Sequence, residues 1–398
     1  MVSVCFYFQV HQPFRLRKYQ VFDIGQSREY FDDVKNREIM QRVARKCYTP
    51  TNKLILDLIE EFNGKFKVSY SITGVALEQF QLYAPEVLES FQKLADTGCV
   101  EFLDETYYHS LAFLYSEKEF KEQIKLHRKK IQEFFGQKPK VFRNTELVYN
   151  NRLAEIVEKL GYTGVLAEGA DRILEWRSPN FIYKPKNCKK IKMLLKHYRL
   201  SDDIAFRFSE RSWDGWPLTA DKFAAWISAA NGNGHVVNLF MDYETFGEHQ
   251  WEETGIFEFL RHLPGEILKH PDNNFMMPTE AINTYEPVAE LDIPHIVSWA
   301  DIERDLSAWL GNKMQQSSIE NLYQLEKAVK NSKDQKILDD WRKLQTADHF
   351  YYMCTKWFND GDVHKYFNVY DRPHDSFINF MNVLTDLRLR IEENKKRK

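Results

Sequence analysis

The sequence has few cysteines, and no two of them lie close together. No CxxC pair occurs, which argues against a zinc ribbon and against a dense disulfide framework. We therefore expect reduced, buried thiols at the five positions, which are Cys5, Cys47, Cys99, Cys188 and Cys354.

Long apolar runs are also absent. No stretch reaches about 18 consecutive apolar residues, so no transmembrane helix is expected. The opening segment "MVSVCFYFQVHQPF" is apolar only up to Val10, and it lacks both a basic leader and a small-residue cleavage site. We interpret it as a first strand rather than a signal peptide, and the sequence thus predicts a cytoplasmic protein.

The sequence has no marked excess of charge of either sign. Lys and Arg total 55 against 58 Asp and Glu, which gives a formal net charge of −3. This balance gives no electrostatic reason to expect a nucleic acid or an anionic membrane as partner, so a neutral partner is expected. The 29 Phe, 20 Tyr and 9 Trp residues suit stacking on sugar rings, but they equally suit an ordinary core. The sequence gives no oligomeric state.

Internal repeats, low-complexity segments and long Gly/Ser linkers are missing, so we expect one rigid body. Up to about residue 300 the chain instead shows short apolar runs, several of which end in polar residues and precede a helical pattern. This is typical of β/α units around a parallel sheet, and the number of runs suffices for a barrel. The runs are "VSVCFYFQV", "KFKVSYSI", "CVEFLD", "KVFRNT", "TGVLAE", "IKMLLKHYRL", "HVVNLFMD" and "PHIVSW".

Two helices between these runs can be placed from their end signals. Ser116 and Glu119 have capping-box spacing, and a helical face follows that includes Phe120, Ile124 and His127. A second helix is predicted to begin near residue 150 and to end at 161, where a glycine follows the last buried position. After about residue 313 the strand signals fade and apolar residues recur at helical spacing, which predicts a helical region at 313–398 packed on a barrel at 1–312.

Polar side chains collect where the predicted strands end. Because the carboxyl ends of parallel strands share one face of a barrel, we expect these side chains to lie together. They are His11, Gln12, Asp104, Glu105, Tyr107, His109, Glu146, Asp242, Glu244, Trp299, Asp301, Asp305 and Trp309.

Two carboxylates from different strands can hydrolyse a glycosidic bond, one as nucleophile and the other as proton donor. Each residue alone has a simpler interpretation. An acid after a strand is often a helix cap or a solvated loop charge, His11 could be a core histidine, and Trp299 and Trp309 could pack against the C-terminal helices. The joint occurrence of acids, imidazoles and indoles favours the site.

Five ordered motifs resemble glycoside hydrolase family 57, and most closely its α-amylase-type members. They are "HQP" at 11–13, "CVEFLDETYYHSL" at 99–111, "FRNTELVYN" at 142–150, "FMDYETFGEHQ" at 240–250 and "SWADIERDLSAWLGN" at 298–312. Further on, "TADHFYYMCTKW" and "DGDVHKYFNVYDRP" also resemble that group, and the first of them contributes Asp348 and His349.

The resemblance implies an α/β fold, namely an incomplete (β/α)7 barrel with a C-terminal helical bundle, and a retaining mechanism on α-1,4-glucans or maltooligosaccharides. It assigns the nucleophile to Glu146 and the acid/base to Asp242, with Glu244 as a neighbour that tunes or orients Asp242. No cofactor and no metal are implied. The remaining predicted substrate-binding residues are His11, Gln12, Glu105, Tyr107, His109, Trp299, Asp301, Asp305, Trp309, Asp348 and His349. A donor such as Arg143 is expected to keep Glu146 ionised.

Three other functions stay open. A 4-α-glucanotransferase or a glucan-branching enzyme would use the same intermediate but release it to a sugar instead of to water. A metal-dependent polysaccharide deacetylase or α-mannosidase could take ligands from His11, Asp104, His109 and Asp242, although no closely spaced histidine pair occurs. A non-catalytic glucan-binding protein would need the aromatic rim but not both carboxylates.

Overall fold

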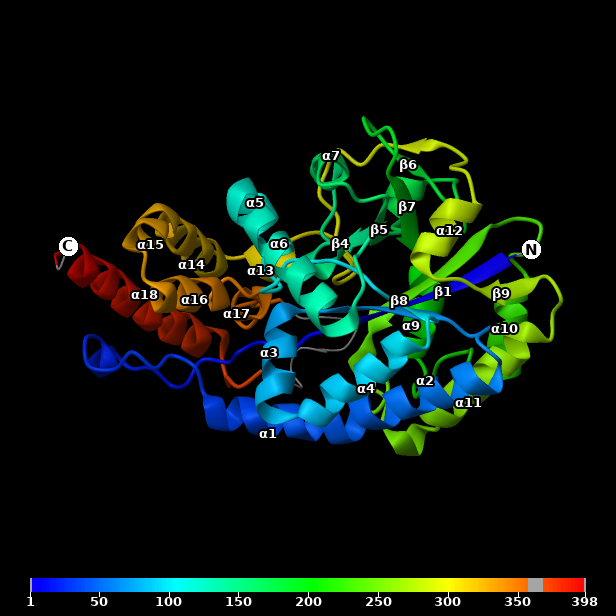
Figure 1. Cartoon of the computed structure of the whole chain (residues 1–398), viewed down its shortest axis with the longest axis horizontal. Coiled ribbons are helices and arrows are strands. Elements are labelled where there is room, and N and C mark those ends of the chain that lie inside the picture. Colours follow the sequence, from blue (N-terminus) through cyan, green and yellow to red (C-terminus); the bar gives the residue numbers. More distant parts are fainter. Residues whose placement is uncertain (1, 357–367, 397–398) are drawn as a thin grey trace.

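The computed structural model describes residues 2–356 and 368–396. The strands lie in the right-hand half of the molecule as drawn in Figure 1, with helices around them; the left-hand half is mainly helical, and the two termini lie at opposite ends of the long axis. The strands are β1 (Val2–Val10), β2 (Val68–Ile72), β3 (Val100–Phe102), β4 (Val141–Arg143), β5 (Gly164–Glu168), β6 (Lys184–Pro185), β7 (Lys192–Lys196), β8 (Val236–Asp242), β9 (Asn273–Phe275) and β10 (Glu290–Leu291).

The strands form parallel sheets. A five-stranded sheet has the order β3-β2-β1-β8, and its fifth strand, β9, pairs with the first residues of β1, while β2 pairs with the last ones. A three-stranded sheet has the order β4-β5-β7, and β10 pairs with β6 in a separate ribbon. Because all the strand pairs are parallel, the strands of each larger sheet end on a common side.

Backbone contacts connect the two larger sheets at both of their edges. Beyond β3, the amide of Asp104 donates to the carbonyl of Val141 at 3.1 Å, and its carbonyl accepts from Arg143 at 2.9 Å. At the opposite edge, the amide of His197, just after β7, donates to the carbonyl of Asn238 in β8 at 2.9 Å. The carboxyl ends of all these strands therefore surround one region.

Helices cover the outer face of the sheets, and both faces of β1 are buried. Alternate residues such as Phe6 and Phe8 pack against the surrounding helices, whereas Cys5 and Tyr7 point to a core shared by both larger sheets. The covering helices are α1 (Asp33–Val43), α2 (Thr49–Glu61), α3 (Gly74–Tyr83), α4 (Pro85–Asp96), α5 (Ala112–Tyr115), α6 (Glu117–Phe135), α7 (Asn151–Lys159), α8 (Asp171–Leu174), α9 (Tyr198–Ala205), α10 (Ala220–Ser228), α11 (Ile256–Leu268) and α12 (Pro278–Thr284).

The two helices predicted from end signals are confirmed as α6 and α7. Ser116 caps α6 by accepting from the amide of Glu119 at 3.2 Å, and Gly136 ends this helix in the left-handed conformation. Asn150 caps α7 in the same way, through the amide of Leu153.

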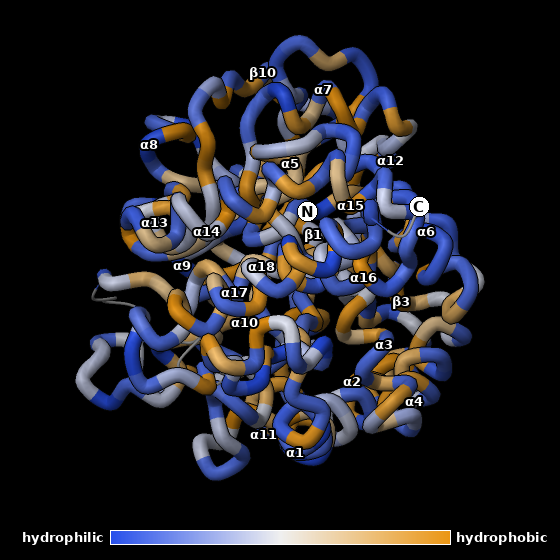
Figure 2. Tube along the Cα trace, turned by 90° about the vertical axis from the view of Figure 1, so that its left-hand side faces the viewer, coloured by the Kyte–Doolittle hydropathy of each residue, from blue (hydrophilic) through white to orange (hydrophobic). Residues whose placement is uncertain are grey.

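Most of the described residues after 306 are helical. The helices are α13 (Ser307–Leu310), α14 (Lys313–Gln324), α15 (Glu326–Ser332), α16 (Gln335–Lys343), α17 (Ala347–Tyr351) and α18 (Pro373–Lys396). They enclose a second core around Trp341, and Tyr19 and Tyr30 from the long segment after β1 pack into it. The hydrophilic segments lie mainly toward the outside of the molecule (Figure 2).

One strand prediction is wrong. The segment 294–299, "PHIVSW", is not a strand, and Val297 makes only an isolated bridge with Tyr149 in the loop after β4. Such short apolar runs do not reveal their partner from periodicity. The strand beside the first half of β1 is instead β9, and the run "IKMLLKHYRL" gives β7 followed by α9.

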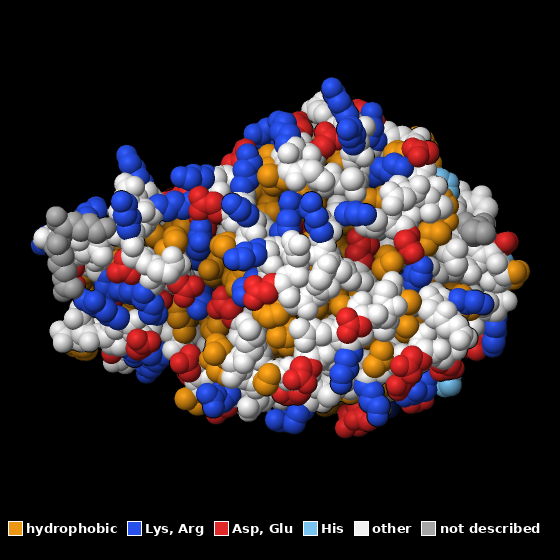
Figure 3. Space-filling model, in the orientation of Figure 1, with side chains coloured by type: hydrophobic (Ala, Val, Ile, Leu, Met, Phe, Trp, Pro, Cys, Tyr) orange, Lys and Arg blue, Asp and Glu red, His pale blue; other side chains and the backbone are white. Residues whose placement is uncertain are grey.

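The thiol prediction is correct in part. All five cysteines are free, but Cys99 and Cys354 are only half-buried. In residues 2–356 and 368–396, no helix has the length and apolar character needed to cross a membrane. Basic and acidic side chains are interspersed on the face shown in Figure 3, in keeping with the small net charge. The motif at 360–373 lies largely outside the described residues.

Candidate active site

A hollow lies where the parallel strands end, and both predicted catalytic carboxylates line it. Glu146 follows β4, and Asp242 is the last residue of β8. Trp299 and Asp301, from the loop before α13, line the hollow with them, as do Lys196 and Arg304. The parallel strands therefore bring together, at their carboxyl ends, residues that are far apart in the sequence.

The carboxylate of Glu146 is held by two ring N–H groups. The indole Nε1 of Trp299 donates to Oε2 at 2.6 Å, and Nε2 of His109 lies 2.9 Å from Oε1. Glu146 also has a φ of 55° in the 3₁₀ turn η3 (Thr145–Leu147), a conformation that costs free energy for a residue with a side chain. Backbone strain and two specific bonds at one residue indicate a functional constraint on the direction of this carboxylate.

A second buried carboxylate lies behind His109. Nδ1 of His109 lies 3.2 Å from Oε2 of Glu105, and the side-chain amide of Gln9 donates from Nε2 to Oε1 of Glu105 at 3.0 Å. Burial alone would raise the pKa of Glu105, but the bond to His109 and the charges of His109 and Arg143 outweigh it and lower the pKa to about 2. Burial alone would lower the pKa of His109, but its bonds to Glu105 and Glu146 raise it to about 9.

Arg143 is fully buried beside this group. Its Nη1 lies 3.9 Å from Oε2 of Glu105, and its guanidinium lies over the indole of Trp299 at 4.7 Å from the ring centroid. Arg143 does not donate to Glu146 as predicted, because its guanidinium nitrogens make no hydrogen bond; it instead balances the charge of Glu105 and packs on the ring that bonds Glu146.

Glu244 is buried close to Asp242. Its carboxylate accepts from the hydroxyl of Tyr48 and, at 3.4 Å, from the side-chain amide of Gln12. Burial, followed by the charge of Asp242, raises the pKa of Glu244 to about 8, although the bonds from Tyr48 and Gln12 oppose this rise. A negative charge on Asp242 therefore makes ionisation of Glu244 less favourable, and the reverse holds for Asp242.

A π-helix places Tyr48 against this acid. The segment η2 (Ala44–Tyr48) continues α1 with π-helical geometry, which occurs often at functional sites. The carbonyl of Lys46 in η2 faces Gly247, and a Cβ on this glycine would lie 1.9 Å from the carbonyl oxygen. Only a glycine permits the loop after Asp242 to approach η2 this closely.

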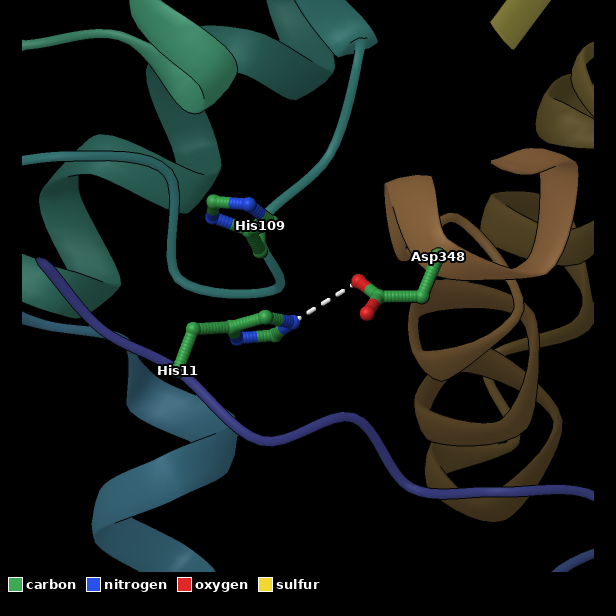
Figure 4. A group of neighbouring side chains, drawn as sticks. All are labelled: His11, His109 and Asp348. Carbon is green, nitrogen blue, oxygen red and sulfur yellow. Dashed lines mark hydrogen bonds and ion pairs between the residues drawn. The ribbon is translucent and has the colours of Figure 1, made fainter. Parts of the chain in front are cut away.

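His11 and Asp348 meet on the other side of His109. Nε2 of His11 lies 2.9 Å from Oδ2 of Asp348, and its ring stacks on that of His109 with centroids 4.0 Å apart (Figure 4). Ligand atoms of these three residues lie within 4.8 Å of one another, as metal ligands would. The nitrogens already have partners, however: Nδ1 of His11 bonds to Thr73, and both nitrogens of His109 face carboxylates. A metal ion would have to displace these bonds.

Asp104, a ligand in the metal-dependent alternative, points elsewhere. It is fully buried, and its carboxylate bonds to Nδ1 of His127 at 2.5 Å, to Nε of Arg128 at 3.2 Å and to the hydroxyl of Tyr162. Its carboxylate therefore connects the end of β3 to α6 and does not join the trio of His11, His109 and Asp348.

Of the twelve predicted substrate-binding residues, Trp299 and Asp301 line the hollow and the other ten do not. Four of these ten have partners well away from it. The hydroxyl of Tyr107 donates to Glu78 at 2.8 Å, and Asp305 accepts from the amide and hydroxyl of Ser307. Trp309 is fully buried in the C-terminal core. His349 is also buried, which lowers its pKa to about 4, and it packs against Phe380.

Sequence reasoning missed an ionic cluster at the hollow. Nζ of Lys196 lies 2.9 Å from Oδ1 of Asp202, and Arg304 lies 3.4 Å from both Asp202 and Glu168. Burial raises the pKa of Glu168 to about 7 against the opposing charges of Lys196 and Arg304. Arg304 also donates to the carbonyl of Trp299 at 3.0 Å. Glu168 and Lys196 are the last residues of β5 and β7, so both could have been predicted from the expectation that polar side chains at strand ends lie together.

Comparison with known proteins agrees with these motifs. Residues 5–294 match the family model of glycosyl hydrolase family 57. A protein of Methanocaldococcus jannaschii named "Putative alpha-amylase" is 48% identical over 403 residues, which covers 98% of this chain and 85% of that protein.

Solved structures share the fold at low sequence identity. The 4-alpha-glucanotransferase from Thermococcus litoralis has a TM-score of 0.72 at 16% identity, and the match covers 98% of this chain but only 60% of that enzyme. A branching enzyme from Pyrococcus horikoshii has a TM-score of 0.69 at 15% identity, with 100% and 91% covered. Since the family model spans well over half of the chain, the chain belongs to glycosyl hydrolase family 57 and is a glycoside hydrolase.

Proposed function

We propose that the protein is a retaining, α-amylase-like hydrolase of α-1,4-glucans, with Glu146 as nucleophile and Asp242 as acid/base. One observation carries this proposal: Glu146 and Asp242 come from different strands, line the same hollow, and have different surroundings. Glu146 receives N–H donors on both oxygens, which favours its ionised form. Asp242 stands beside the buried acid Glu244, and repulsion between two carboxylates favours a proton on the pair.

The proposed reaction begins with Glu146 ionised and with the proton of the Asp242–Glu244 pair on Asp242. Asp242 donates its proton to the glycosidic oxygen while a carboxylate oxygen of Glu146 attacks the anomeric carbon, so the old C–O bond breaks as a glycosyl ester forms. Asp242, now ionised, then removes a proton from water. The water oxygen attacks the same carbon, the ester bond breaks, and Glu146 leaves as a carboxylate. The configuration at the anomeric carbon is retained after two inversions.

The fold supports the same proposal. The two larger sheets contribute seven parallel strands when β9 is set aside, and backbone bonds join them at Asp104 and at His197. We therefore propose an incomplete (β/α)7 barrel at 1–312 and a helical bundle at 313–398. The segment with Tyr19 and Tyr30 ties the barrel to the bundle.

The substrate proposal rests on charge and on relatives. A net charge of −3 suits a neutral polymer, and the relative from M. jannaschii carries alpha-amylase in its name. We propose that Asp301, which lines the hollow, and His11 and Asp348, whose side chains are 10% and 6% exposed, contact sugar hydroxyls. Free cysteines fit the cytoplasmic location predicted from the sequence.

Product analysis on amylose and maltooligosaccharides tests the proposal. We expect Glu146→Gln and Asp242→Asn to lose turnover while both still bind glucan. On a maltosyl fluoride, whose leaving group needs no proton, azide should rescue the two variants differently: in Glu146→Gln it replaces the nucleophile and gives an inverted glycosyl azide, whereas in Asp242→Asn it attacks the intermediate and gives a retained one. Full activity of Glu146→Gln in a clean preparation would refute the nucleophile assignment.

Transfer to a second sugar is the second candidate. The solved relatives include a 4-alpha-glucanotransferase and a branching enzyme, and the same intermediate serves both reactions. Incubation with one pure maltooligosaccharide separates the candidates, because transfer yields longer chains and hydrolysis yields only shorter ones. A metal-dependent enzyme would lose its activity in EDTA, and the proposed hydrolase would keep it. A glucan-binding protein without activity would release no reducing sugar.

A further inference from the structure

His109 lies between two carboxylates and faces each with one ring nitrogen. Nδ1 lies 3.2 Å from Oε2 of Glu105, and Nε2 lies 2.9 Å from Oε1 of Glu146. An ionised carboxylate can only accept hydrogen bonds, whereas a neutral imidazole has one donor and one acceptor nitrogen. Both contacts can be hydrogen bonds to ionised acids only if both nitrogens carry hydrogen, which makes the ring an imidazolium.

The surroundings of His109 leave it little access to a substrate. Its side chain is only 2% exposed, it does not line the hollow, and the ring of His11 covers one face. His11 is held in this place by Thr73 and Asp348 (Figure 4). The charge of His109 is one cause of the lowered pKa of His11, after burial, so a second proton on the stacked pair is disfavoured.

The acid behind His109 is anchored inside the protein. Glu105 is fully buried and accepts from the side-chain amide nitrogen of Gln9. The side-chain oxygen of Gln9 in turn accepts from the hydroxyl of Tyr7 at 2.8 Å. Arg143 adds a positive charge at 3.9 Å. Glu105 is therefore a fixed anion that orients His109 from the side opposite to Glu146.

We propose that His109 is a positioning residue that stays protonated through the reaction and ties the nucleophile Glu146 to the buried anion Glu105, rather than a residue that binds sugar. This inference rests on the proposed role of Glu146. The left-handed conformation of both residues, with φ of 50° at His109 and 55° at Glu146, is the cost of this geometry.

The bridge has a consequence for the second half of the reaction. When Glu146 is esterified it loses its negative charge, and His109 keeps its bond to Glu105. As the ester bond breaks, negative charge returns to Glu146, and the N–H of His109 is already directed at Oε1. His109 thus favours departure of the carboxylate, in the way that a preorganised donor stabilises developing charge.

Titration of the ring nitrogens by ¹⁵N NMR tests the protonation state without any substrate. We expect the ring of His109 to be an imidazolium at pH 8, with its signal assigned by its absence in His109→Gln. Raised pKa values are expected for only a few histidines, among them His127, which bonds to Asp104 and to the carbonyl of Ile72. In Glu146→Gln the pKa of His109 should fall, because one of its two anions is gone, while that of His127 stays unchanged.

Two NMR results would overturn the inference: a neutral ring at position 109 at pH 8, or a titration that Glu146→Gln leaves unmoved. Neither result depends on glucan hydrolysis, so the inference can fail while the proposed function holds, and the reverse. The wild-type spectrum and Glu146→Gln suffice if His109→Gln does not fold.

Steady-state kinetics on a maltooligosaccharide separate positioning from substrate binding. We expect His109→Gln to lower kcat about 100-fold, the effect of removing one preorganised donor, with KM little changed. A raised KM at unchanged kcat would instead show that His109 binds the sugar. His11→Gln serves as the comparison, since His11 bonds to Thr73 and Asp348 rather than to Glu146 and is proposed to contact the substrate.

Discussion

At the scale of single residues, the indole of Trp299 holds Glu146 from the side of the hollow. Its Nε1 donates to Oε2 at 2.6 Å, and its backbone amide donates to the carbonyl of the same residue at 3.2 Å. The first bond depends on the side chain and the second does not. Substitution of the indole therefore tests the side-chain bond alone.

Trp299→Phe should lower kcat on maltooligosaccharides by about 100-fold or more, because the ring remains but the donor to Glu146 is lost. The melting temperature should change little. Trp251→Phe is the matched control, since Trp251 is 54% exposed and lies in a different hollow beside Lys46. Equal kcat for Trp299→Phe and the wild type would contradict this role of the indole.

The buried acid Glu244 predicts a dependence of stability on pH. Its pKa in the folded protein is raised to about 8, mainly by burial, from a usual value of 4.5. The folded state thus favours the protonated form, and the resulting stability is present below pH 4.5 and is lost as the pH rises through 8.

Glu244→Gln cannot ionise, so it should avoid this loss. We expect the free energy of unfolding of the variant to match that of the wild type at pH 5 and to exceed it at pH 9 by a few kcal/mol, on the order set by the size of the shift. Urea unfolding at the two pH values measures the difference. The same difference at both pH values would show that Glu244 is ionised in the folded protein at pH 5.

At the scale of elements, the close contact between η2 and the loop after β8 controls the placement of Tyr48 and Glu244. A Cβ at Gly247 would overlap the carbonyl of Lys46, and the φ of Gly247 is +106°. The two atoms that lie too close belong to the backbone of Lys46 and not to the end of a flexible side chain, so the backbone itself would have to move.

Gly247→Ala should therefore reduce both stability and kcat. Gly232→Ala is the control, because this glycine has a φ of +82° but nothing within 4 Å of an added Cβ. The control should lower the free energy of unfolding by only about 1–2 kcal/mol, the penalty of the left-handed conformation, and leave kcat unchanged. Gly247→Ala should lower the free energy of unfolding by at least about twice as much. Equal costs for the two variants, measured by urea unfolding, would mean that η2 and the loop are not tightly coupled.

Elements also show which parts of the fold could be predicted. The short apolar runs of β1 and β8 and the capped helices α6 and α7 carry strong local signals, and all four are predicted from the sequence. The strand β9, "NNF", contains a single apolar residue, so its pairing with β1 depends on contacts that no local pattern encodes. The run "PHIVSW" has the apolar content of a strand, but the loop after β4 takes up the backbone bonds of Val297.

The same limit applies to the site. The position of strand ends predicts Glu146 and Asp242 as candidate site residues, and the family resemblance assigns their catalytic roles; the hollow includes both. Trp309, in α13, shares its motif with Trp299 but is fully buried in the C-terminal core, because sequence spacing alone does not say toward which side each residue points. The contact of Tyr48 with Glu244 could not be foreseen either, since it depends on the π-helical geometry of η2.

At the scale of the whole molecule, a buried ionic cluster joins α6 to the C-terminal helices. Glu119, at the start of α6, is fully buried, and its carboxylate meets Nε of Arg342 at 2.8 Å and Nζ of Lys330 at 2.8 Å. These partners belong to α16 and α15, which lie beyond residue 313. The cluster therefore couples the proposed barrel to the proposed bundle.

Removal of the acid should destabilise the molecule as a whole. Glu119→Gln removes the fully buried partner of Arg342 and Lys330, which keep ion pairs with Glu122 and Glu326, and we expect the free energy of unfolding to fall by about 1–3 kcal/mol. Glu393→Gln is the control, because its pair with Arg28 is about half exposed and worth about 1 kcal/mol or less. Urea unfolding followed by both fluorescence and circular dichroism should give a single shared transition, since α6 lies between β3 and β4 in the chain and cannot loosen without them. Two separated transitions in the wild type, or equal losses in the two variants, would mean that the C-terminal helices fold independently of the strands and that Glu119 does not couple them.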